Sequence, residues 1–228
     1  MTDLVLVRTH NNPAQGVKKN SDSGTYSGRR NPPYGIMYIA GYCRLKGHTV
    51  KLYDLFKPEF EELSIDAIAD QIIGDAPLVV GISAMTNQSV QAMELGDALM
   101  QKSDIKVIHG GMHSATMPEE ALKHGHFVVK GDGEHTMHEI LQHIKDTGEM
   151  LPTQQQHAGT NLITDSISDR VYDGHLLTVE ELDSVPWFTK EHFDETAFDF
   201  SLDPHFPVMT ARGCPYRCVF CKDGFGLR

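Results

Sequence analysis

The sequence predicts an α/β fold in which a doubly wound, parallel sheet of five strands is covered by helices on both faces. Two observations support this prediction. Within the first 147 residues, short apolar runs alternate five times with longer segments of helical periodicity, which is the order of β–α units. The runs, such as LVLVR at residues 4–8 and LVVGIS at residues 78–83, are apolar at nearly every position, as expected for strands buried on both faces.

The first elements can be assigned from the amino terminus onward. The strand at residues 4–8 precedes a polar loop over residues 10–32, and loops of this length in compact domains are often functional. Residues 33–46 are predicted to form a helix, because the segment opens with proline, carries apolar residues at helical spacing and is followed by Gly47 as a cap. Residues 49–55 alternate between polar and apolar side chains and are predicted to form the next strand.

The same alternation continues to residue 147. Ser64 is a good amino-terminal cap for a helix over residues 64–75, in which isoleucine and alanine side chains form one apolar face. The repeated units predict a Rossmann-like domain over residues 1–147. The remaining elements of this domain are predicted as strands at residues 78–83, 105–111 and 127–131 and as helices at residues 87–102, 118–125 and 134–146.

The rest of the chain is predicted to form a connector and the start of a second domain. Residues 148–204 lose the alternation, so their short apolar fragments, including RVYDG, are interpreted as a small hairpin or an extended linker. Pro186 interrupts any helix in the segment VEELDSVPWF. The run FPVMTARG at residues 206–213 is predicted to be a short strand that leads into a cysteine-rich loop. Residues 205–228 would then begin the second domain.

Composition and charge exclude several classes of function. The net charge is −11, and no tract rich in lysine and arginine is present, which argues against a nucleic-acid-binding surface. The amino terminus lacks the pattern of a signal peptide, and no run approaches the roughly 18 apolar residues of a membrane span. A cytoplasmic protein is therefore expected. In a reducing compartment, clustered cysteines more often bind metal than form disulfides.

Three of the four cysteines lie close together near the carboxyl terminus. Cys214, Cys218 and Cys221 have the spacing C-x₃-C-x₂-C, and thiolates suit zinc, copper(I) or iron–sulfur clusters. A structural zinc site uses four ligands, but the residues after Cys221 supply no fourth and Cys43 falls on a predicted helix of the first domain. Three thiolates on a four-iron cluster would leave one iron open for another ligand. Zinc and unligated thiols remain the alternatives.

The segment R-G-C-P-Y-R-C-V-F-C resembles the cluster loop of radical S-adenosylmethionine enzymes. This resemblance implies that Cys214, Cys218 and Cys221 hold a 4Fe–4S cluster, whose open iron binds the amino and carboxylate groups of S-adenosylmethionine. In that family, reduction cleaves S-adenosylmethionine to a 5′-deoxyadenosyl radical that abstracts hydrogen. The resemblance therefore also implies an external one-electron reductant as a partner.

Polar residues and glycines follow three of the predicted strands. The carboxyl ends of parallel strands meet at one edge of a doubly wound sheet, where such sheets bind ligands. None of the three segments matches the G-x-G-x-x-G or P-loop patterns, so nicotinamide and nucleoside triphosphate sites lose support. Taken singly, each segment is also typical of a turn or a helix cap. The candidate cofactor-binding residues are Ser83, Thr86, Gly110, Gly111, Gly131, Gly133 and Glu134.

Together, the segments S-x-x-T, G-G-M-H-S-A-T-M-P-E-E-A-L and V-V-K-G-D-G-E resemble the cobalamin-binding domain that precedes many radical S-adenosylmethionine domains. The connector segment V-E-E-L-D-S-V-P resembles the one that leads into the radical domain in that class. The resemblance implies that cobalamin lies across the strand ends, with its nucleotide tail buried near the candidate residues. His10 follows the first strand without the aspartate, two residues earlier, that many cobalamin proteins have. No protein histidine is therefore expected on cobalt, and His10 is the alternative ligand.

The resemblance implies a cobalamin-dependent radical S-adenosylmethionine enzyme, of which this sequence is expected to be an amino-terminal portion. Methyl transfer to an unidentified substrate, such as a small molecule, is the commonest reaction of the family, and some members rearrange or cyclise their substrates. This chain alone is expected to be inactive, because the units of the radical domain do not follow Cys221. Two other interpretations stay open: a non-catalytic cobalamin carrier or sensor with a vestigial cysteine tail, and an α/β module with a zinc-binding tail.

Overall fold

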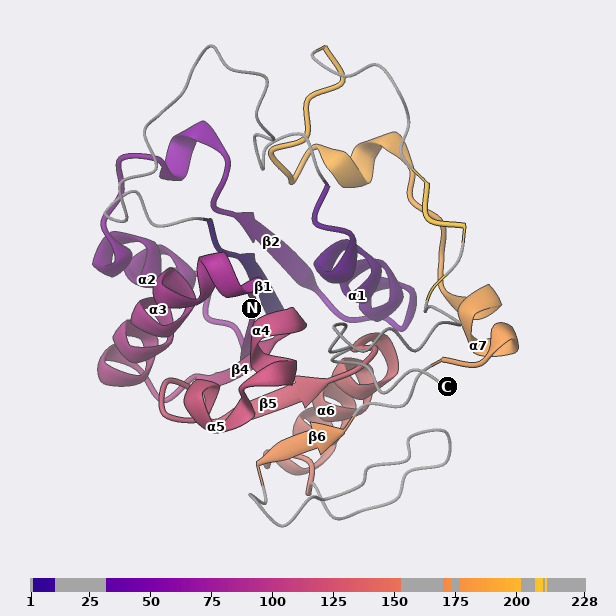
Figure 1. Cartoon of the computed structure of the whole chain (residues 1–228). Coiled ribbons are helices and arrows are strands. Elements are labelled where there is room, and N and C mark those ends of the chain that lie inside the picture. The colour runs from indigo at the N-terminus through magenta and orange to yellow at the C-terminus, as the bar shows by residue number, and fades with distance from the viewer. Residues whose placement is uncertain are drawn as a thin grey trace, which may run out of the picture.

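A computed structural model shows one parallel sheet that runs through the whole domain. Six strands lie in the order β2-β1-β3-β4-β5-β6 (Figure 1). The structure describes residues 2–10, 32–152, 170–173, 177–201, 208–210 and 212. The strands are β1 (Leu4–Arg8), β2 (Val50–Asp54), β3 (Val79–Ser83), β4 (Lys106–Gly110), β5 (Phe127–Lys130) and β6 (Val171–Asp173).

The strand order creates a topological switch point between β1 and β3. From β1 the chain crosses to β2 at one edge of the sheet and then returns past β1 to β3, after which β4, β5 and β6 follow in sequence order. Leu6 in the middle of β1 is paired with Leu52 on one side and with Gly81 on the other. Doubly wound sheets bind ligands beyond the carboxyl ends of their strands at such a point.

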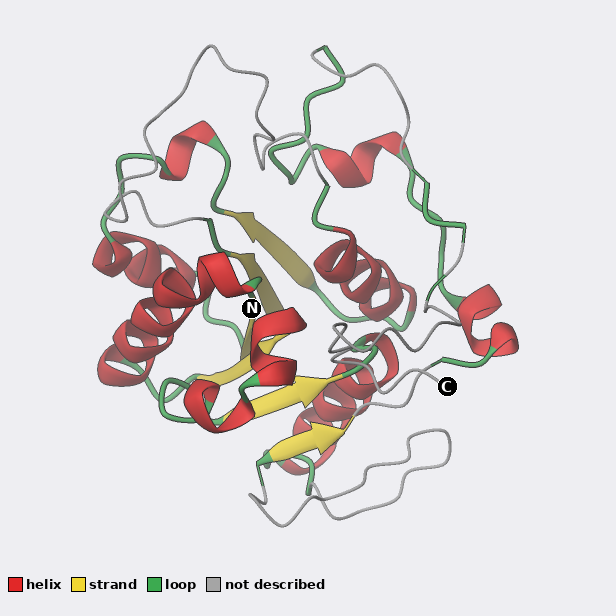
Figure 2. Ribbon diagram, viewed as in Figure 1, coloured by secondary structure: helices red, strands yellow, loops and turns green. Residues whose placement is uncertain are grey.

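Helices cover both faces of the sheet (Figures 1 and 2). Helices α1 and α6 pack together on one face, α2 and α3 pack together on the other, and a hydrophobic cluster lies on each side. No helix in the described part of the chain is long and apolar enough to cross a membrane. The α-helices are α1 (Tyr34–Leu45), α2 (Ile65–Gly74), α3 (Ser89–Lys102), α4 (Gly111–Thr116), α5 (Pro118–Ala121), α6 (Glu134–Thr147) and α7 (Val179–Ser184); the short 3₁₀ helices are η3 (Pro58–Phe60), η4 (Thr86–Gln88) and η5 (Lys190–Phe193).

Local sequence signals determine where several helices begin and end. Ser64 Oγ accepts a 3.2 Å hydrogen bond from the backbone N–H of Ala67, so α2 begins at the predicted cap. Helix α6 ends at Gly148, whose φ of +78° lies in the left-handed region that glycine adopts without strain. Helix α7 ends at Ser184, two residues before Pro186, as the proline predicts.

The predicted doubly wound parallel sheet is confirmed, but the predicted number of five strands is wrong. The sheet has a sixth strand, β6, in the segment RVYDG that was interpreted as a fragment of a hairpin or linker. β6 pairs in parallel with β5, and the hydroxyl of its Tyr172 donates a 2.6 Å hydrogen bond to the carbonyl of Leu151. A strand of three residues has too little periodicity to be recognised without its neighbour.

The short helix α4 was also not predicted. The sequence indicated a strand that continues to residue 111 and no helix between that strand and residue 118. In the structure the strand ends at Gly110, and α4 begins at Gly111, whose φ is +83°. Glycine adopts this conformation readily, so the chain can turn sharply from the strand into the helix.

The strand predicted at residues 206–213 is absent from the described part of that run. Residues 208–210 and 212 are not in a strand, and they pair with none of the strands of the described sheet. The remaining residues of the run lie outside the described residues. An extended segment becomes a stable strand only when a neighbour satisfies its backbone hydrogen-bonding groups.

The connector packs against the domain as part of its core. Phe188, Phe193 and Phe198 are buried in the same hydrophobic cluster as residues of α1 and α6. Arg44 in α1 donates hydrogen bonds of 2.9 and 2.7 Å to the two carboxylate oxygens of Glu195. The predicted extended linker is therefore, in its described part, a segment fixed to the sheet domain.

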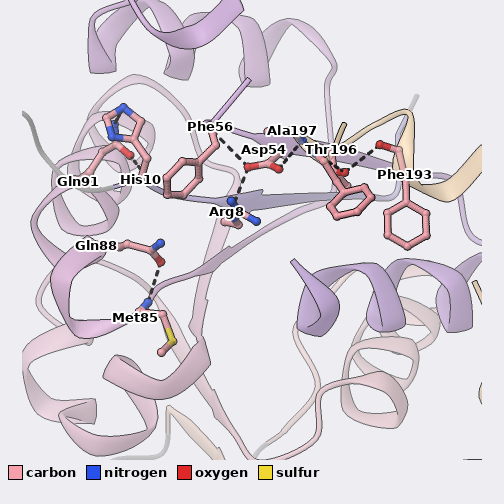
Figure 3. Close-up of polar contacts among 11 residues, drawn as sticks. Arg8, His10, Asp54, Phe56, Met85, Gln88, Gln91, Phe193, Thr196 and Ala197 are labelled. Atoms are coloured by element: carbon pink, nitrogen blue, oxygen red, sulfur yellow. Dashed lines mark hydrogen bonds and ion pairs between the residues drawn. The ribbon is translucent and has the colours of Figure 1, made fainter. Parts of the chain in front are cut away.

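A buried aspartate also fixes this segment (Figure 3). Asp54, the last residue of β2, has no exposed side-chain surface, and one of its oxygens accepts a 2.7 Å hydrogen bond from the N–H of Ala197. The other oxygen lies 3.2 Å from Nε of Arg8 and accepts a hydrogen bond from the N–H of Phe56. Asp54 stays buried because Arg8 compensates its charge; removing Arg8 would leave an uncompensated buried charge. The hydrogen bond from Ala197 to this fixed carboxylate holds the connector at the carboxyl edge of the sheet.

A pair of histidines lies between the end of α1 and the middle of α6. Nε2 of His48 is 2.9 Å from Nδ1 of His138, and His48 is almost fully buried. Burial lowers the pKa of both imidazoles; the charge of Lys145 lowers the pKa of His48 further, and His48 lowers that of His138 further. The folded protein therefore binds fewer protons at this pair than the unfolded chain does below the ordinary histidine pKa of about 6.5.

The free energy of unfolding is expected to fall when the pH is lowered from about 7.5 to 5.5. Stability from this pair is fully present above the unfolded histidine pKa and is lost below it, by at most about 1.4 kcal/mol per pH unit for each histidine. Urea titrations at several pH values measure the slope. The double replacement His48→Gln with His138→Gln should reduce the slope. A slope equal to that of the wild-type chain would contradict this assignment.

Candidate cofactor site

A cavity of about 460 Å³ lies at the carboxyl edge of the sheet. It is lined by residues of β1, β3, β4 and β5, by the amino-terminal halves of α1 and α6, and by Met209 and Arg212 near the end of the chain. The cavity therefore spans the switch point between β1 and β3. Its volume lies within the range of about 300–1,000 Å³ that is typical of small-molecule and cofactor pockets.

Most of the cavity wall is apolar. The sheet and the helices both contribute apolar side chains, so burial of an aromatic or aliphatic group of a ligand here would be energetically favourable. Burial lowers the pKa of His109, and its Nε2 donates a hydrogen bond to the carbonyl of His124. The apolar lining residues are Leu6, Ile36, Tyr38, Ile39, Ile82, Ile108, Val129, Met137 and Met209.

Two adjacent glycines at the end of β4 shape the cavity in different ways. At Gly111, a Cβ atom would lie 2.8 Å from Ser83 Oγ and 2.9 Å from the backbone nitrogen of Ala84, so only glycine allows this close approach of β3 and α4. At Gly110, the only atom near a Cβ would be the carbonyl oxygen of Val129, at 3.8 Å. Gly111 is therefore needed by the fold, whereas Gly110 leaves space in front of the strand end.

Two carboxylates lie at the turn between β5 and α6. Glu134 is buried as the first residue of α6, where the helix dipole favours a negative charge. Arg212 donates one hydrogen bond of 2.5 Å to Glu134 and another of 2.9 Å to Asp132, and its guanidinium lies 4.6 Å from the centre of the Tyr38 ring. Burial lowers the pKa of Arg212, but these two carboxylates outweigh that effect and raise it. The other oxygen of Asp132 accepts a hydrogen bond from the N–H of Leu177.

The structure brings six of the seven predicted residues to one cavity: Ser83, Gly110, Gly111, Gly131, Gly133 and Glu134. The seventh, Thr86, is exposed in η4 at the same edge and does not line the cavity. Sequence reasoning missed Asp132, although it stands inside the quoted segment K-G-D-G-E. It also missed Met209 and Arg212, which lie more than 70 residues away along the chain.

Comparison with protein families shows which family the chain belongs to. The family model for the B12 binding domain matches residues 24–141, which is 118 of the 228 residues. The chain belongs to this family. The cobalamin-binding family that the sequence motifs indicated is thus confirmed, and the matched range includes all seven predicted cofactor-binding residues.

The B12-binding chain is similar to longer proteins over most of its own length. It is 27% identical over 207 residues to the uncharacterized methyltransferase PH0819 of Pyrococcus horikoshii, covering 88% of this chain and 43% of that protein. It is 27% identical over 204 residues to the anaerobic magnesium-protoporphyrin IX monomethyl ester cyclase of Rubrivivax gelatinosus, covering 84% and 35%. The chain therefore spans less than half the length of these two relatives.

A solved structure was also matched. The radical S-adenosylmethionine methyltransferase TsrM from Kitasatospora setae, with cobalamin and a [4Fe-4S] cluster bound, superposes with a TM-score of 0.49 at 19% identity. The match covers 64% of this chain and 25% of that one.

The residues of the B12-binding domain fit the nucleotide tail of cobalamin. The tail carries a flat aromatic base, and the cavity offers apolar walls on both the sheet and the helix side. The open space in front of Gly110 lets a ligand approach the backbone closely. Ser83, Glu134 and Arg212 add polar groups to the lining, as expected of a site that orients its ligand.

His10, the alternative cobalt ligand, is held by Gln91 of α3 (Figure 3). The backbone N–H of His10 donates a 2.7 Å hydrogen bond to Oε1 of Gln91, which leaves the amide nitrogen to face the imidazole. That nitrogen lies 3.2 Å from Nε2 of His10 and donates to it. Nε2 would have to leave Gln91 before it could ligate a metal.

The three predicted cluster ligands, Cys214, Cys218 and Cys221, lie outside the described residues. Cys43 is fully buried in α1, and burial raises the pKa of its thiol to about 12, so it stays protonated at neutral pH. Among the described residues, no group of three or more His, Cys, Asp or Glu side chains is arranged to hold a metal ion. The cluster prediction therefore rests on the sequence pattern.

Proposed function

We propose that this chain is the cobalamin-binding front portion of a radical S-adenosylmethionine enzyme and that the cavity at the switch point takes the nucleotide tail of cobalamin. The observation that carries the proposal is a cavity of about 460 Å³ in which Ser83 at the end of β3 and the glycines that follow β4 and β5 converge. The family match over residues 24–141 supports the same ligand. Bound cobalamin would supply a cobalt centre that can carry a methyl group.

The protein's own residues have distinct parts in this proposal. Gly110 would leave space for the tail at the end of β4, and Gly111 allows the close approach of β3 and α4 beside it. Ile39 and Met137 of the two covering helices would exclude water from the base of the tail. Thr86, exposed at the same edge, would contact the part of the ligand outside the cavity. With its Nε2 engaged by Gln91, His10 would not be available to cobalt.

The proposed chemistry is methyl transfer to an unidentified substrate. Cys214, Cys218 and Cys221 would hold a 4Fe–4S cluster that binds S-adenosylmethionine, and an external one-electron donor would reduce it. The Pyrococcus relative is named as a methyltransferase, which supports this choice, and the Rubrivivax relative is named as a cyclase, which makes cyclisation the second outcome. The proposed location is the cytoplasm, a reducing compartment in which the cysteine thiols would stay reduced.

An anaerobic absorption spectrum of the purified chain, taken after incubation with hydroxocobalamin and desalting, tests the proposal. Corrin bands should be retained at close to one equivalent per chain. Their complete loss on desalting would contradict the proposed ligand.

Iron and sulfide analysis of the same sample, after anaerobic reconstitution, tests the cluster. Iron with sulfide is expected, and Cys43→Ala should leave both unchanged because Cys43 is buried away from the surface. Retained corrin without iron would favour a cobalamin carrier or sensor, and zinc without sulfide would favour a zinc-binding tail.

A further inference from the structure

Arg212 connects two parts of the chain that have different proposed roles. Its side chain is largely buried against Asp132 and Glu134, which line the cavity, and only about a fifth of it is exposed. In the sequence it precedes Cys214, the first cysteine of the motif, by two residues. Met209, three residues earlier, also lines the cavity. The segment that leads to the cysteines is thus attached to the wall of the cavity.

The attachment has the chemistry of a strong contact. Glu134 has a side chain that is only 3% exposed, and a buried carboxylate is costly unless a cation or hydrogen bonds compensate it. Arg212 supplies both, because its planar guanidinium donates to Glu134 and Asp132 at the same time. The ring of Tyr38 covers the guanidinium at 4.6 Å, which is the distance of a cation–π contact.

A ligand in the cavity would strengthen this contact. Filling the cavity displaces water next to the carboxylates, and charge-assisted hydrogen bonds are stronger in the lower dielectric that results. Arg212 and Met209 in turn contribute to the wall that would cover the ligand. Binding of a ligand in the cavity and the contact of Arg212 with the two carboxylates therefore favour each other.

We propose that Arg212 couples occupancy of the cavity to the position of the segment that carries the cysteine motif. The proposal rests on the proposed function, in which cobalamin fills this cavity. Coupling of this kind is reciprocal: if cobalamin binding holds Arg212 in place, a free Arg212 must weaken cobalamin binding by the same factor. Arg212 is a positioning residue in this account, because it holds the segment that leads to the cysteines in place by binding Asp132 and Glu134 of the cavity wall.

Equilibrium dialysis with hydroxocobalamin measures one side of the coupling. Arg212→Ala should raise the dissociation constant about tenfold, within the range of about 5- to 150-fold that is typical of coupled sites. Arg44→Ala is the matched control, since Arg44 holds Glu195 of the connector through two similar hydrogen bonds but does not line the cavity. Arg44→Ala should change the dissociation constant for hydroxocobalamin by less than about twofold. An equal effect of the two replacements would overturn the proposal.

A double replacement separates coupling from general loosening. Glu134→Gln removes the charge that Arg212 compensates. Arg212→Ala should therefore raise the dissociation constant for hydroxocobalamin by a smaller factor in the Glu134→Gln background than in the wild-type chain. Additive losses in the double variant would contradict a direct Arg212–Glu134 contact.

Trypsin cleavage after Arg212 measures the other side of the coupling. The protease must take the Arg212 side chain into its own pocket, so the contacts with Asp132 and Glu134 should protect this bond. Saturating hydroxocobalamin should slow cleavage after Arg212 about fivefold or more, with cleavage of an added unstructured peptide in the same digest as the reference for trypsin activity. If the wild-type chain retains no corrin, the proposed function fails. If it retains corrin while cleavage is unchanged and Arg212→Ala binds normally, only the coupling fails.

Discussion

Replacing Gly110 with leucine is expected to abolish cobalamin retention while leaving the fold intact. The backbone of Gly110 has φ of −146° and ψ of −170°, an extended conformation that any residue adopts. A Cβ atom there would meet only one atom within 4 Å, so the leucine side chain would extend into the cavity instead of into the core. It would occupy space that the nucleotide tail needs, and the dissociation constant for hydroxocobalamin should rise about a hundredfold or more.

Dialysis and a thermal melt together check this prediction. The melting temperature should stay close to that of the wild-type chain. Gly74→Leu is the matched control, because Gly74 is exposed at the end of α2 and a Cβ there would meet no atom within 4 Å. That variant should bind hydroxocobalamin normally. Normal binding by Gly110→Leu would show that cobalamin does not use this cavity.

Replacing Phe193 with alanine should destabilise the whole sheet domain. Phe193 is 1% exposed, and the rings of Phe198 and Phe200 each lie 5.3 Å from its own. Truncating a fully buried phenylalanine typically costs about 3–5 kcal/mol of unfolding free energy. Because this cluster is continuous with residues of α1 and α6, the loss should appear in the main cooperative transition of a urea titration.

Trp187→Ala provides the control for this stability measurement. Trp187 is an aromatic residue of the same segment, but 68% of its surface is exposed. Its replacement should change the unfolding free energy by less than about 0.5 kcal/mol. If Phe193→Ala left the main transition unchanged and only a separate minor transition moved, the connector would be an appendage and not part of the core.

Much of the fold could be predicted because its signals are local. The apolar runs at residues 4–8 and 78–83 became the strands Leu4–Arg8 and Val79–Ser83, with ends that differ by at most one residue. Ser64 capped α2 as expected. β6 could not be predicted, because its three residues are held by pairing with β5 and by the Tyr172 hydroxyl, and both contacts are made with distant parts of the chain.

The candidate site could likewise be predicted only where it depends on local sequence signals. Ser83, Gly110 and Glu134 were found because the carboxyl ends of parallel strands meet at one edge, so residues after different strands can be grouped from the sequence alone. Arg212 was missed because its contact with Glu134 joins residues 78 positions apart, and no pattern in a single sequence marks such a contact. The burial of the connector's aromatic residues was missed for the same reason, because they pack against residues of α1 and α6 that are distant in the sequence.

The location of the bound cobalamin is the central claim, and hydrogen–deuterium exchange with and without hydroxocobalamin tests it most directly. Backbone amides of residues 81–84, 109–112 and 130–137 should exchange more slowly in the loaded chain, because these segments line the cavity. Amides of α2, on the opposite face, should not change. Tight binding of hydroxocobalamin with no protection of these three segments would contradict the account.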